Sequence, residues 1–383
     1  MRNKEEIRLQ RVVMALCAIL FAVFSFLFVA VYQAPLLEVL YEKVATGKLQ
    51  YNPYVAGGFI SAILTILALW LNKFTAFKRE WTALSFIPSV LILTFVTDIN
   101  RGIYTGEYNY VKWITVFAVG VFAYAAFSFV LRRMLFAKIK NIAMSANRII
   151  WRNLQIFVIM FCLTGFLVNG EENFKREALI HSCYNKGDTE KALKVGYLSN
   201  TASQSLTAQR AYILAKEGLL GEKLFEYPQL YGSEGLLPQQ KQISPLAPDS
   251  VFAMLGTSPA SDESSSATLL RAVSLESPST IAKEYYLSAL LLDRRIVDFV
   301  DAMGRIYPDT DFKNLPKHYQ EAIMLYASIS GDTTIVCNNN AMQEQFNAFR
   351  TLEIQHEDPF VRGNYIRRKF GRTYWWYYLY GNI

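Results

Sequence analysis

Five long apolar runs in the first 170 residues limit the possible folds of this chain more than any other feature. A helix of about 17–25 apolar residues suffices to cross the hydrocarbon core of a membrane. The first run is also longer than the apolar part of a signal peptide, and no small-residue cleavage site follows it. We therefore expect residues 1–170 to form a transmembrane domain. Its five spans are predicted at residues 12–32, 54–72, 81–98, 112–131 and 153–169.

The charge distribution agrees with a membrane domain. The 383 residues are 52% hydrophobic and carry a formal net charge of +7. The basic excess lies in the apolar part, because residues 1–170 hold 17 Lys and Arg against 7 Asp and Glu, whereas the remainder holds 22 against 25. A nucleic-acid-binding protein would carry its positive charge on a soluble face. We therefore expect the lipid bilayer, and no nucleic acid, as a partner.

The basic residues of the short loops predict the orientation, because cytoplasmic loops are enriched in Lys and Arg. One side of the predicted membrane domain carries 13 of them and the other side four. The larger set is Arg2, Lys4, Arg8, Arg11, Lys73, Lys78, Arg79, Arg132, Arg133, Lys138, Lys140, Arg148 and Arg152. The smaller set is Lys43, Lys48, Arg101 and Lys112. We expect a multi-pass protein of the bacterial inner membrane, with a cytoplasmic N-terminus and residues 171–383 in the periplasm.

Two loops of the membrane domain have an amphipathic pattern. Residues 34–49 place leucines at helical spacing and are expected to lie at the membrane interface. Residues 132–152 combine apolar and basic residues, and the pattern fits equally an interfacial helix or spans that extend beyond the membrane surface. Pro88 is expected to kink the third span.

Ionisable groups inside spans usually mark transport pathways, and these spans are nearly free of them. Asp98 ends the third run, with Arg101 as a candidate partner. Together with Glu38 and Glu107, these residues are the polar candidates at the outer surface of the membrane.

The pattern changes after residue 170 to short amphipathic helices joined by turns. In "ENFKREALIHSCYNKGDTEKALKVGYLS", a helix runs to about Asn185, "KGD" turns the chain, and a second helix starts with Asp188 or Thr189 as its N-cap. Residues 206–229, 281–309 and 315–336 show similar hairpins. Such hairpins bury their apolar faces by stacking into a solenoid, so we expect an all-α fold throughout.

Two resemblances support this interpretation. The segment around Gly187, Asp188, Ala192 and Leu193 resembles a tetratricopeptide (TPR) hairpin, although Gly196 stands where a large residue is usual. The order of "ENFKREA", "GEKLFEYPQLYGSEGLLP", "LPKHYQEAIMLY" and "KFGRTYWWYYLY" resembles a family of uncharacterised bacterial membrane proteins. That resemblance implies a TPR-like helical domain and no known activity. The Ser- and Pro-rich residues 244–270 interrupt the hairpins as a flexible loop or a degraded repeat.

Motifs that carry catalysis or bind metals are missing from the sequence. No CxxC spacing, paired histidine motif, GxSxG or phosphate-binding Gly-rich loop is present. Cys183 and Cys337 could form a disulfide, but we favour two free thiols on separate hairpins. Carboxylate pairs such as Glu171 and Glu172 fit solvated helix starts. We therefore expect no catalytic residue, no metal and no cofactor.

The chain ends with a basic and aromatic segment. From Tyr374 to Tyr380 every residue but Leu379 is aromatic, and residues 361–383 carry five basic residues and no acid. The rings could close the hydrophobic core, dip into the membrane interface or bind a partner. The candidate site residues for membrane or partner binding are Arg367, Arg368, Lys369, Arg372, Trp375, Trp376 and Tyr377.

Three functional interpretations remain open from the sequence. The preferred one is a non-enzymatic, membrane-anchored scaffold whose helical-repeat domain binds a protein partner in the cell envelope. The alternative is a membrane enzyme or transport component that acts on envelope glycans or lipids, through polar groups such as Asp98 and Arg101. A subunit needed only for assembly of a larger complex is the third.

Overall fold

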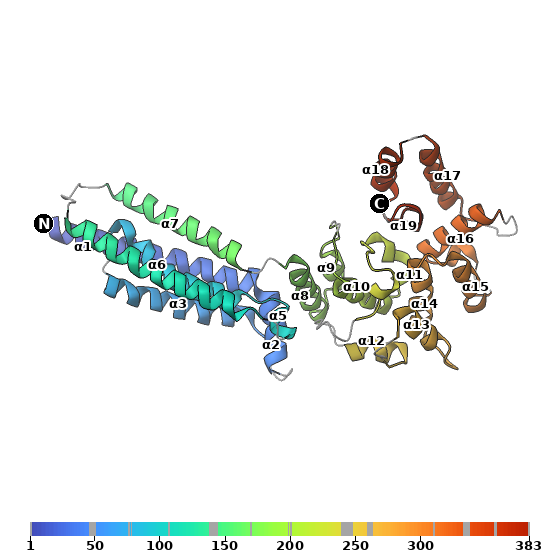
Figure 1. Cartoon of the computed structure of the whole chain (residues 1–383), viewed down its shortest axis with the longest axis horizontal. Helices are drawn as coiled ribbons and strands as arrows, with labels where there is room; N and C mark the ends of the chain where they lie inside the picture. The colour runs from blue at the N-terminus through green and yellow to red at the C-terminus, as the bar shows by residue number, and fades with distance from the viewer. Residues whose placement is uncertain are drawn as a thin grey trace. The chain divides into compact units, whose positions relative to one another are not determined.

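The computed structural model is all-α, as the sequence predicted, and the residues that it describes contain no strand (Figure 1). The chain divides into two compact units, Met1–Ala178 and Leu179–Ile383. The structure describes residues 2–45, 51–75, 77, 79–105, 108–137, 145–168, 171–197, 199, 201–238, 248–258, 263–308, 311–331, 338–355 and 358–381.

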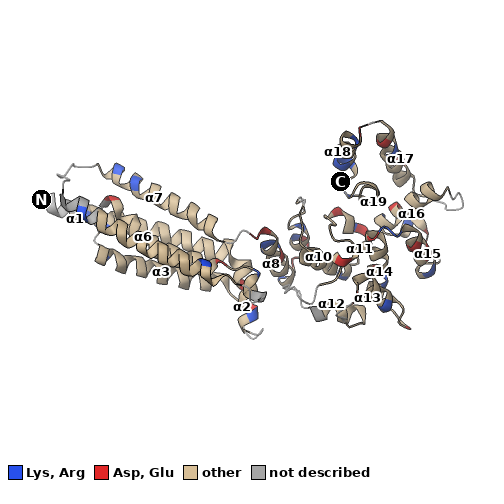
Figure 2. Cartoon of the chain, in the orientation of Figure 1, with Lys and Arg blue, Asp and Glu red and all other residues tan. Residues whose placement is uncertain are grey.

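Among the described residues, five helical segments of the first unit are long and apolar enough to cross a membrane, in agreement with the five predicted spans. They are Ile7–Tyr32, Pro53–Thr75, Glu80–Thr97, Tyr110–Val130 and Ala146–Leu167. Charged side chains are sparse along most of their length (Figure 2). The corresponding elements are α1 (Arg2–Leu27) with a π-helical end (Phe28–Tyr32), α3 (Pro53–Thr75), a 3-10 segment (Arg79–Phe86) followed by α4 (Ile87–Thr97), α6 (Tyr110–Ala137) and α7 (Ala146–Leu167).

Small and hydroxyl side chains let the spans approach one another closely. A Cβ added to Gly57 of α3 would lie only 2.8 Å from the Cβ of Ala30, so glycine is needed where α3 crosses the end of the first span. The hydroxyls of Ser25 and Ser61 are 2.8 Å apart and join the same two spans. Such contacts are the usual means of helix association in lipid, where apolar side chains gain little by leaving the acyl chains.

Two expectations about helix shape are refined by the structure. The third span is a 3-10 helix as far as Phe86 and an α-helix from Ile87, so Pro88 stands in the first turn of α4, where its missing N–H costs no helical hydrogen bond. Of the two alternatives for residues 132–152, the described part shows extended spans, because α6 runs to Ala137 and α7 begins at Ala146. Residues 138–144 lie outside the described residues.

The predicted amphipathic loop helix is present as α2 (Ala34–Ala45). Leu36 and Val39 are its buried side chains, and they share a small core with Phe174 and Ala178 of α8 (Glu172–Asn185). A short helix, α5 (Gly102–Thr105), lies between the third and fourth spans.

The second unit is a succession of short helices around one hydrophobic core that extends from Ile180 to Tyr380. Its elements are the end of α8, then α9 (Thr189–Lys194), α10 (Gln204–Lys216), α11 (Leu220–Lys223), α12 (Pro248–Leu255), α13 (Ser265–Val273), α14 (Thr280–Leu292), α15 (Ile296–Ile306), α16 (Lys317–Ser330), α17 (Asn340–Gln355), α18 (Pro359–Phe370) and α19 (Tyr374–Tyr380). Short 3-10 segments lie at Leu224–Glu226, Gly232–Gly235 and Phe312–Asn314.

Local turn chemistry explains the first predicted hairpin. Gly187 has a φ of 77°, which only glycine adopts at little cost, and it ends α8. Of the two N-cap candidates, Asp188 takes the position, and its carboxylate accepts a hydrogen bond from the backbone N–H of Lys191 at 3.2 Å. The predicted pair of helices on either side of "KGD" is therefore present.

The Ser- and Pro-rich stretch contains helices rather than only a loop. Residues Pro248–Leu255 form α12, and Ser264 caps α13 by accepting a hydrogen bond from the backbone N–H of Ala267. Val251, Leu255 and Leu269 are buried in the core of the unit. The described part therefore fits the degraded repeat, one of the two alternatives; residues 239–247 and 259–262 lie outside the described residues.

Candidate functional site

The aromatic C-terminal helix α19 is built into the hydrophobic core by one face. Thr373 caps it, with a hydroxyl that accepts a hydrogen bond from the backbone N–H of Trp376 at 3.3 Å. The side chains of Tyr374 and Trp375 are fully buried, and Trp375 packs against Phe346, Phe349 and Phe370. The structure therefore places Trp375 in the core, as in the first of the three alternatives, and away from any binding surface.

A buried carboxylate fixes the start of α19 on α16. The Oε2 atom of Glu321 accepts a 2.7 Å hydrogen bond from the backbone N–H of Tyr374 and lies 2.9 Å from Nδ1 of His318. Both side chains of the His318–Glu321 pair are completely buried. The indole N–H of Trp375 donates to the main-chain carbonyl of the same Glu321 at 2.7 Å. These contacts determine which faces of α19 remain accessible.

Helix α18 presents the basic residues of the C-terminal segment. Asp358 caps it and Pro359 occupies its first turn, as expected for a helix start. Ile366 and Phe370 face the core, so the intervening Arg367, Arg368 and Lys369 are exposed. Figure 2 shows this concentration of Lys and Arg on α18.

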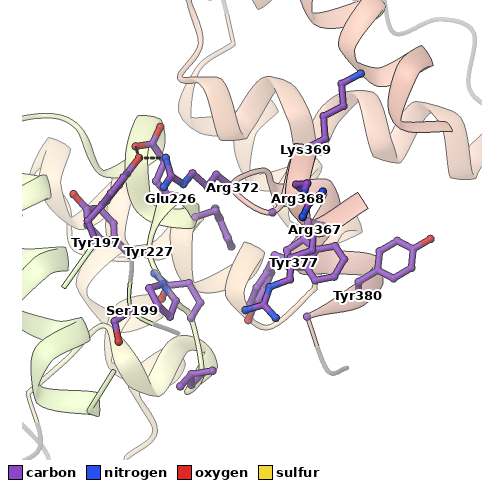
Figure 3. Close-up of a pocket in the computed structure, with 17 residues that line it drawn as sticks. Tyr197, Ser199, Glu226, Tyr227, Arg367, Arg368, Lys369, Arg372, Tyr377 and Tyr380 are labelled. Atoms are coloured by element: carbon purple, nitrogen blue, oxygen red, sulfur yellow. Dashed lines mark hydrogen bonds between the residues drawn. The ribbon is translucent and has the colours of Figure 1, made fainter. Parts of the chain in front are cut away.

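A cleft of about 620 Å³ lies beside these two helices, and we call it the basic cleft (Figure 3). One wall consists of Tyr197, Ser199 and the segment 225–230 that follows α11. The other wall consists of one face of α19, with the half-buried Trp376 and Tyr377 and the largely buried Tyr380, and of the preceding residues Arg367, Arg368, Lys369, Gly371 and Arg372. Six of the predicted site residues thus line one cleft: Arg367, Arg368, Lys369, Arg372, Trp376 and Tyr377.

Arg372 joins the two walls at one end of the cleft. Its guanidinium lies 4.1 Å from the ring centroid of Tyr197 and donates a 2.6 Å hydrogen bond to the Tyr197 hydroxyl. That hydroxyl in turn donates to a carboxylate oxygen of Glu226 at 3.4 Å (Figure 3). Arg372 and Tyr197 are 175 positions apart in the chain, so the cleft exists only in the folded unit.

Two arginines, one buried and one half-buried, pack against rings of the walls. Arg210, which is buried, lies 4.9 Å from the ring centroid of Tyr227. On the other wall, Arg294 lies 5.3 Å from the ring centroid of Tyr377, whose hydroxyl donates a 2.6 Å hydrogen bond to the carbonyl of Leu292. Burial raises the pKa of Tyr227 and that of Tyr377 from 10.0 to about 12, because the low-dielectric surroundings disfavour the charged phenolate.

The charge of the cleft is strongly unbalanced. Its lining residues include four basic side chains, from Arg367, Arg368, Lys369 and Arg372, and a single acidic one, Glu226. Glu226 is partly neutralised by Lys317, whose Nζ atom lies 3.7 Å from Oε1. Water screens these exposed cations, but their proximity still gives the cleft a positive potential that attracts anions.

A second hollow, of about 670 Å³, adjoins the basic cleft along α18. It is lined by Asn364, Tyr365 and the same two arginines, Arg367 and Arg368. Phe360, one turn earlier on the helix, is 72% exposed. The arginines are thus accessible from both hollows, and aromatic rings flank them on each side.

The lining of the basic cleft is suited to binding rather than to covalent chemistry. The described residues that line it include no His, Cys or Asp, and their one aliphatic hydroxyl, that of Ser199, donates a hydrogen bond to the carbonyl of Thr201. Among the described residues, no group of three or more His, Cys, Asp or Glu side chains is placed to hold a metal ion.

Asp98 and Arg101, the candidates at the end of the third span, take different partners from the one expected. Asp98 is 2% exposed and accepts hydrogen bonds from the indole N–H of Trp113 at 2.6 Å and from Lys112 at 3.2 Å. Arg101 donates to the buried carboxylate of Glu177 at 2.6 Å. The expected pairing of Asp98 with Arg101 is therefore corrected: the chain folds Lys112 and Trp113 onto Asp98. Glu107, like Cys337, lies outside the described residues.

Sequence reasoning missed one entire wall of the cleft. Tyr197, Glu226 and Tyr227 are far from the C-terminal segment in the chain, and their positions became apparent only from the fold. The one signal for Glu226 and Tyr227 was the stretch "GEKLFEYPQLYG", which is rich in aromatic residues but otherwise fits the second helix of a hairpin and the turn after it.

Comparison with known proteins gives one relationship. Residues 258–381 match a family of unknown function (DUF6057). The match covers α13 to α19, and hence the C-terminal wall of the basic cleft, but not the five spans. The resemblance to an uncharacterised family thus has a counterpart in this region, and it brings no activity. No curated protein and no solved structure matches the chain.

Proposed function

We propose that this protein is a membrane-anchored scaffold whose helical domain, residues 171–383, binds a protein partner through the basic cleft. The observation that carries the proposal is the bridge from Arg372 to Tyr197, by which distant parts of the chain form one cleft with braced aromatic walls. Partner-binding surfaces are enriched in Tyr, Trp and Arg, and a preformed cleft loses little conformational entropy on binding.

The proposal includes an orientation. The N-terminus lies in the cytoplasm and residues 171–383 lie outside it, in the periplasm of a bacterium. The support is the 13 to four distribution of Lys and Arg among the short loops, together with an odd number of membrane-length helices. In this orientation the basic cleft faces the cell envelope and its proteins.

We also propose that the helical hairpins are degenerate repeats of the TPR type. Support comes from the first hairpin, where Ala192 and Leu193 are buried after the turn at Gly187 and the cap at Asp188. Repeats of this kind present extended surfaces to peptides and proteins.

The alternative, an envelope enzyme or transport component, has weaker support. It needs polar groups that act on a substrate at the outer membrane surface, yet Asp98 and Arg101 are engaged by Trp113, Lys112 and Glu177. These contacts explain both residues as parts of the fold of the first unit.

Site-specific cross-linking tests the scaffold proposal. A photoreactive amino acid replaces Leu230, which lines the basic cleft and is 57% exposed. The control places the same group at Lys313, an exposed position that does not line the cleft. We expect irradiated cells to yield a discrete cross-linked protein from position 230 and not from position 313. Cross-links absent from both positions would count against a partner at this cleft.

A further inference from the structure

Only the end of the helical domain has an excess of positive over negative charge. Residues 171–360 contain 17 Lys and Arg against 25 Asp and Glu, whereas residues 361–383 contain five basic residues and no acid. Four of these five line the basic cleft. An anionic ligand therefore meets attraction at the cleft within a domain that is otherwise acidic, and this difference directs it to one place.

The shape of the cleft selects among anionic ligands. The ring of Tyr227 is buried in one wall and that of Tyr377 is half-buried in the other, whereas the arginines of the cleft are exposed. A flat bilayer surface does not enter such a concave site. A single phosphate or carboxylate ion would contact the cations but leave the aromatic walls unused. A flexible chain that carries several anionic groups can contact both the cations and the aromatic walls.

The second hollow extends the site along α18. Because Arg367 and Arg368 line both hollows, a chain seated in the basic cleft can pass over the two arginines toward Asn364 and Tyr365. The guanidinium group binds carboxylates in a bidentate manner, and clusters of arginines recognise acidic motifs in peptides. The aromatic walls provide faces for apolar or aromatic side chains between the acidic ones.

We infer that the basic cleft binds an extended acidic peptide segment with interspersed aromatic or apolar side chains. This inference rests on the proposed function and specifies the part of the partner protein that is recognised. Arg368 and Lys369 contact the carboxylates, and the rings of Tyr197 and Trp376 contact the side chains between them.

The test uses the full chain in nanodiscs of neutral lipid and measures the fluorescence polarisation of a labelled peptide of alternating Glu and Tyr. We expect saturable binding that weakens about tenfold or more in Arg368→Glu/Lys369→Glu, because each reversal replaces attraction by repulsion. The matched control, Arg305→Glu/Lys313→Glu, makes the same change of net charge at exposed positions outside the cleft and should bind like the wild type.

Probe variants distinguish the chemistry of recognition. Peptides of alternating Gln and Tyr, or of Glu and Gly, should bind more weakly than the Glu and Tyr peptide. Equal binding of the Gln and Tyr peptide would overturn the role of the carboxylates. An unchanged affinity of Arg368→Glu/Lys369→Glu for the Glu and Tyr peptide would also overturn the role of the carboxylates.

A fluorescent amino acid at position 230 identifies other occupants of the cleft. We expect its emission to change on addition of the Glu and Tyr peptide, and not when inorganic phosphate is added or when anionic lipid replaces neutral lipid at constant ionic strength. A response to anionic lipid without a response to peptide would overturn the inference in favour of the membrane surface. A response to phosphate alone would favour a small anion.

Failure of this inference is separable from failure of the proposed function. If Arg368→Glu/Lys369→Glu still cross-links a partner from position 230, the acidic-peptide inference is wrong but the scaffold proposal stands. If the wild-type chain cross-links no protein, the scaffold proposal itself fails.

Discussion

The indole N–H of Trp375 donates a 2.7 Å hydrogen bond to the main-chain carbonyl of Glu321, a residue 54 positions earlier on α16. Trp375 is fully buried, and the carboxylate of the same Glu321 accepts a hydrogen bond from the backbone of Tyr374. The last helix thus belongs to the core and gives the basic cleft its second wall. Stability of the helical domain and shape of the cleft therefore depend on the same contacts.

The helical domain should fold without the spans. Its core extends from Ile180 to Tyr380, and the described residues after 171 include no helix long and apolar enough to cross a membrane. We expect residues 171–383, which keep α8 whole, to fold and to give a helical circular-dichroism spectrum. A spectrum of a disordered or strand-rich chain would contradict this prediction.

Trp375→Ala should destabilise the isolated helical domain by about 3–5 kcal/mol, because it leaves a large cavity among Phe346, Phe349 and Phe370 and removes the hydrogen bond from the indole to the carbonyl of Glu321. Denaturant unfolding measures the change. The control Leu379→Ala alters an exposed position of the same helix and should cost well under 1 kcal/mol. Equal costs for the two variants would show that α19 is not part of the core.

The helical domain should lose stability at alkaline pH. Burial raises the pKa values of Tyr227 and Tyr377 from 10.0 to about 12, so the folded state keeps protons that the unfolded state releases. This contribution is fully present below pH 10.0 and is lost as the pH rises through about 12. Denaturant unfolding between neutral pH and about pH 11 should show the loss, and Tyr227→Phe should reduce it. Stability that stays constant over this range would contradict the burial of these phenols.

Asp98→Leu should lower the amount of protein in the membrane. The substitution leaves the indole N–H of Trp113 without its acceptor and removes the carboxylate from Lys112, and an unsatisfied buried donor costs about 1–3 kcal/mol. Asp98→Asn keeps an oxygen for Trp113 and should have a smaller effect. Quantitative immunoblotting of membranes and thermal aggregation in detergent measure both. If the two variants match the wild type, the contacts of Asp98 are not structural.

Apolar runs predicted the spans, and short amphipathic helices joined by turns predicted the all-α class, because both features depend on local sequence patterns. A run of apolar residues long enough for a span, or a Gly-Asp turn such as Gly187–Asp188, is visible without knowledge of distant residues. Small-residue packing was harder to foresee. Gly57 and Ala30 meet in a single contact that follows no repeated spacing in the sequence.

The candidate site was only half predictable for the same reason. The basic and aromatic C-terminal segment stands out in composition, and six of its seven candidate residues line the basic cleft. Which of the rings enter the core depended on Glu321, and the opposite wall depended on how residues 197–230 fold back. The C-terminal segment contains neither Glu321 nor residues 197–230. The sequence alone therefore could not show that Trp375 is buried in the core and that Trp376 lines the cleft.

The orientation of the chain tests the account most directly, because a partner in the envelope can reach the basic cleft only if residues 171–383 lie outside the cytoplasm. A reporter that is active only outside the cytoplasm is fused after residue 383, and its counterpart that is active only in the cytoplasm is fused to the same position. A chain truncated after residue 137, which ends beyond the fourth span, serves as the internal control with both reporters. We expect the outside reporter to be active at residue 383 and the cytoplasmic reporter at residue 137. Cytoplasmic activity at residue 383 would contradict the membrane topology and with it the proposed function.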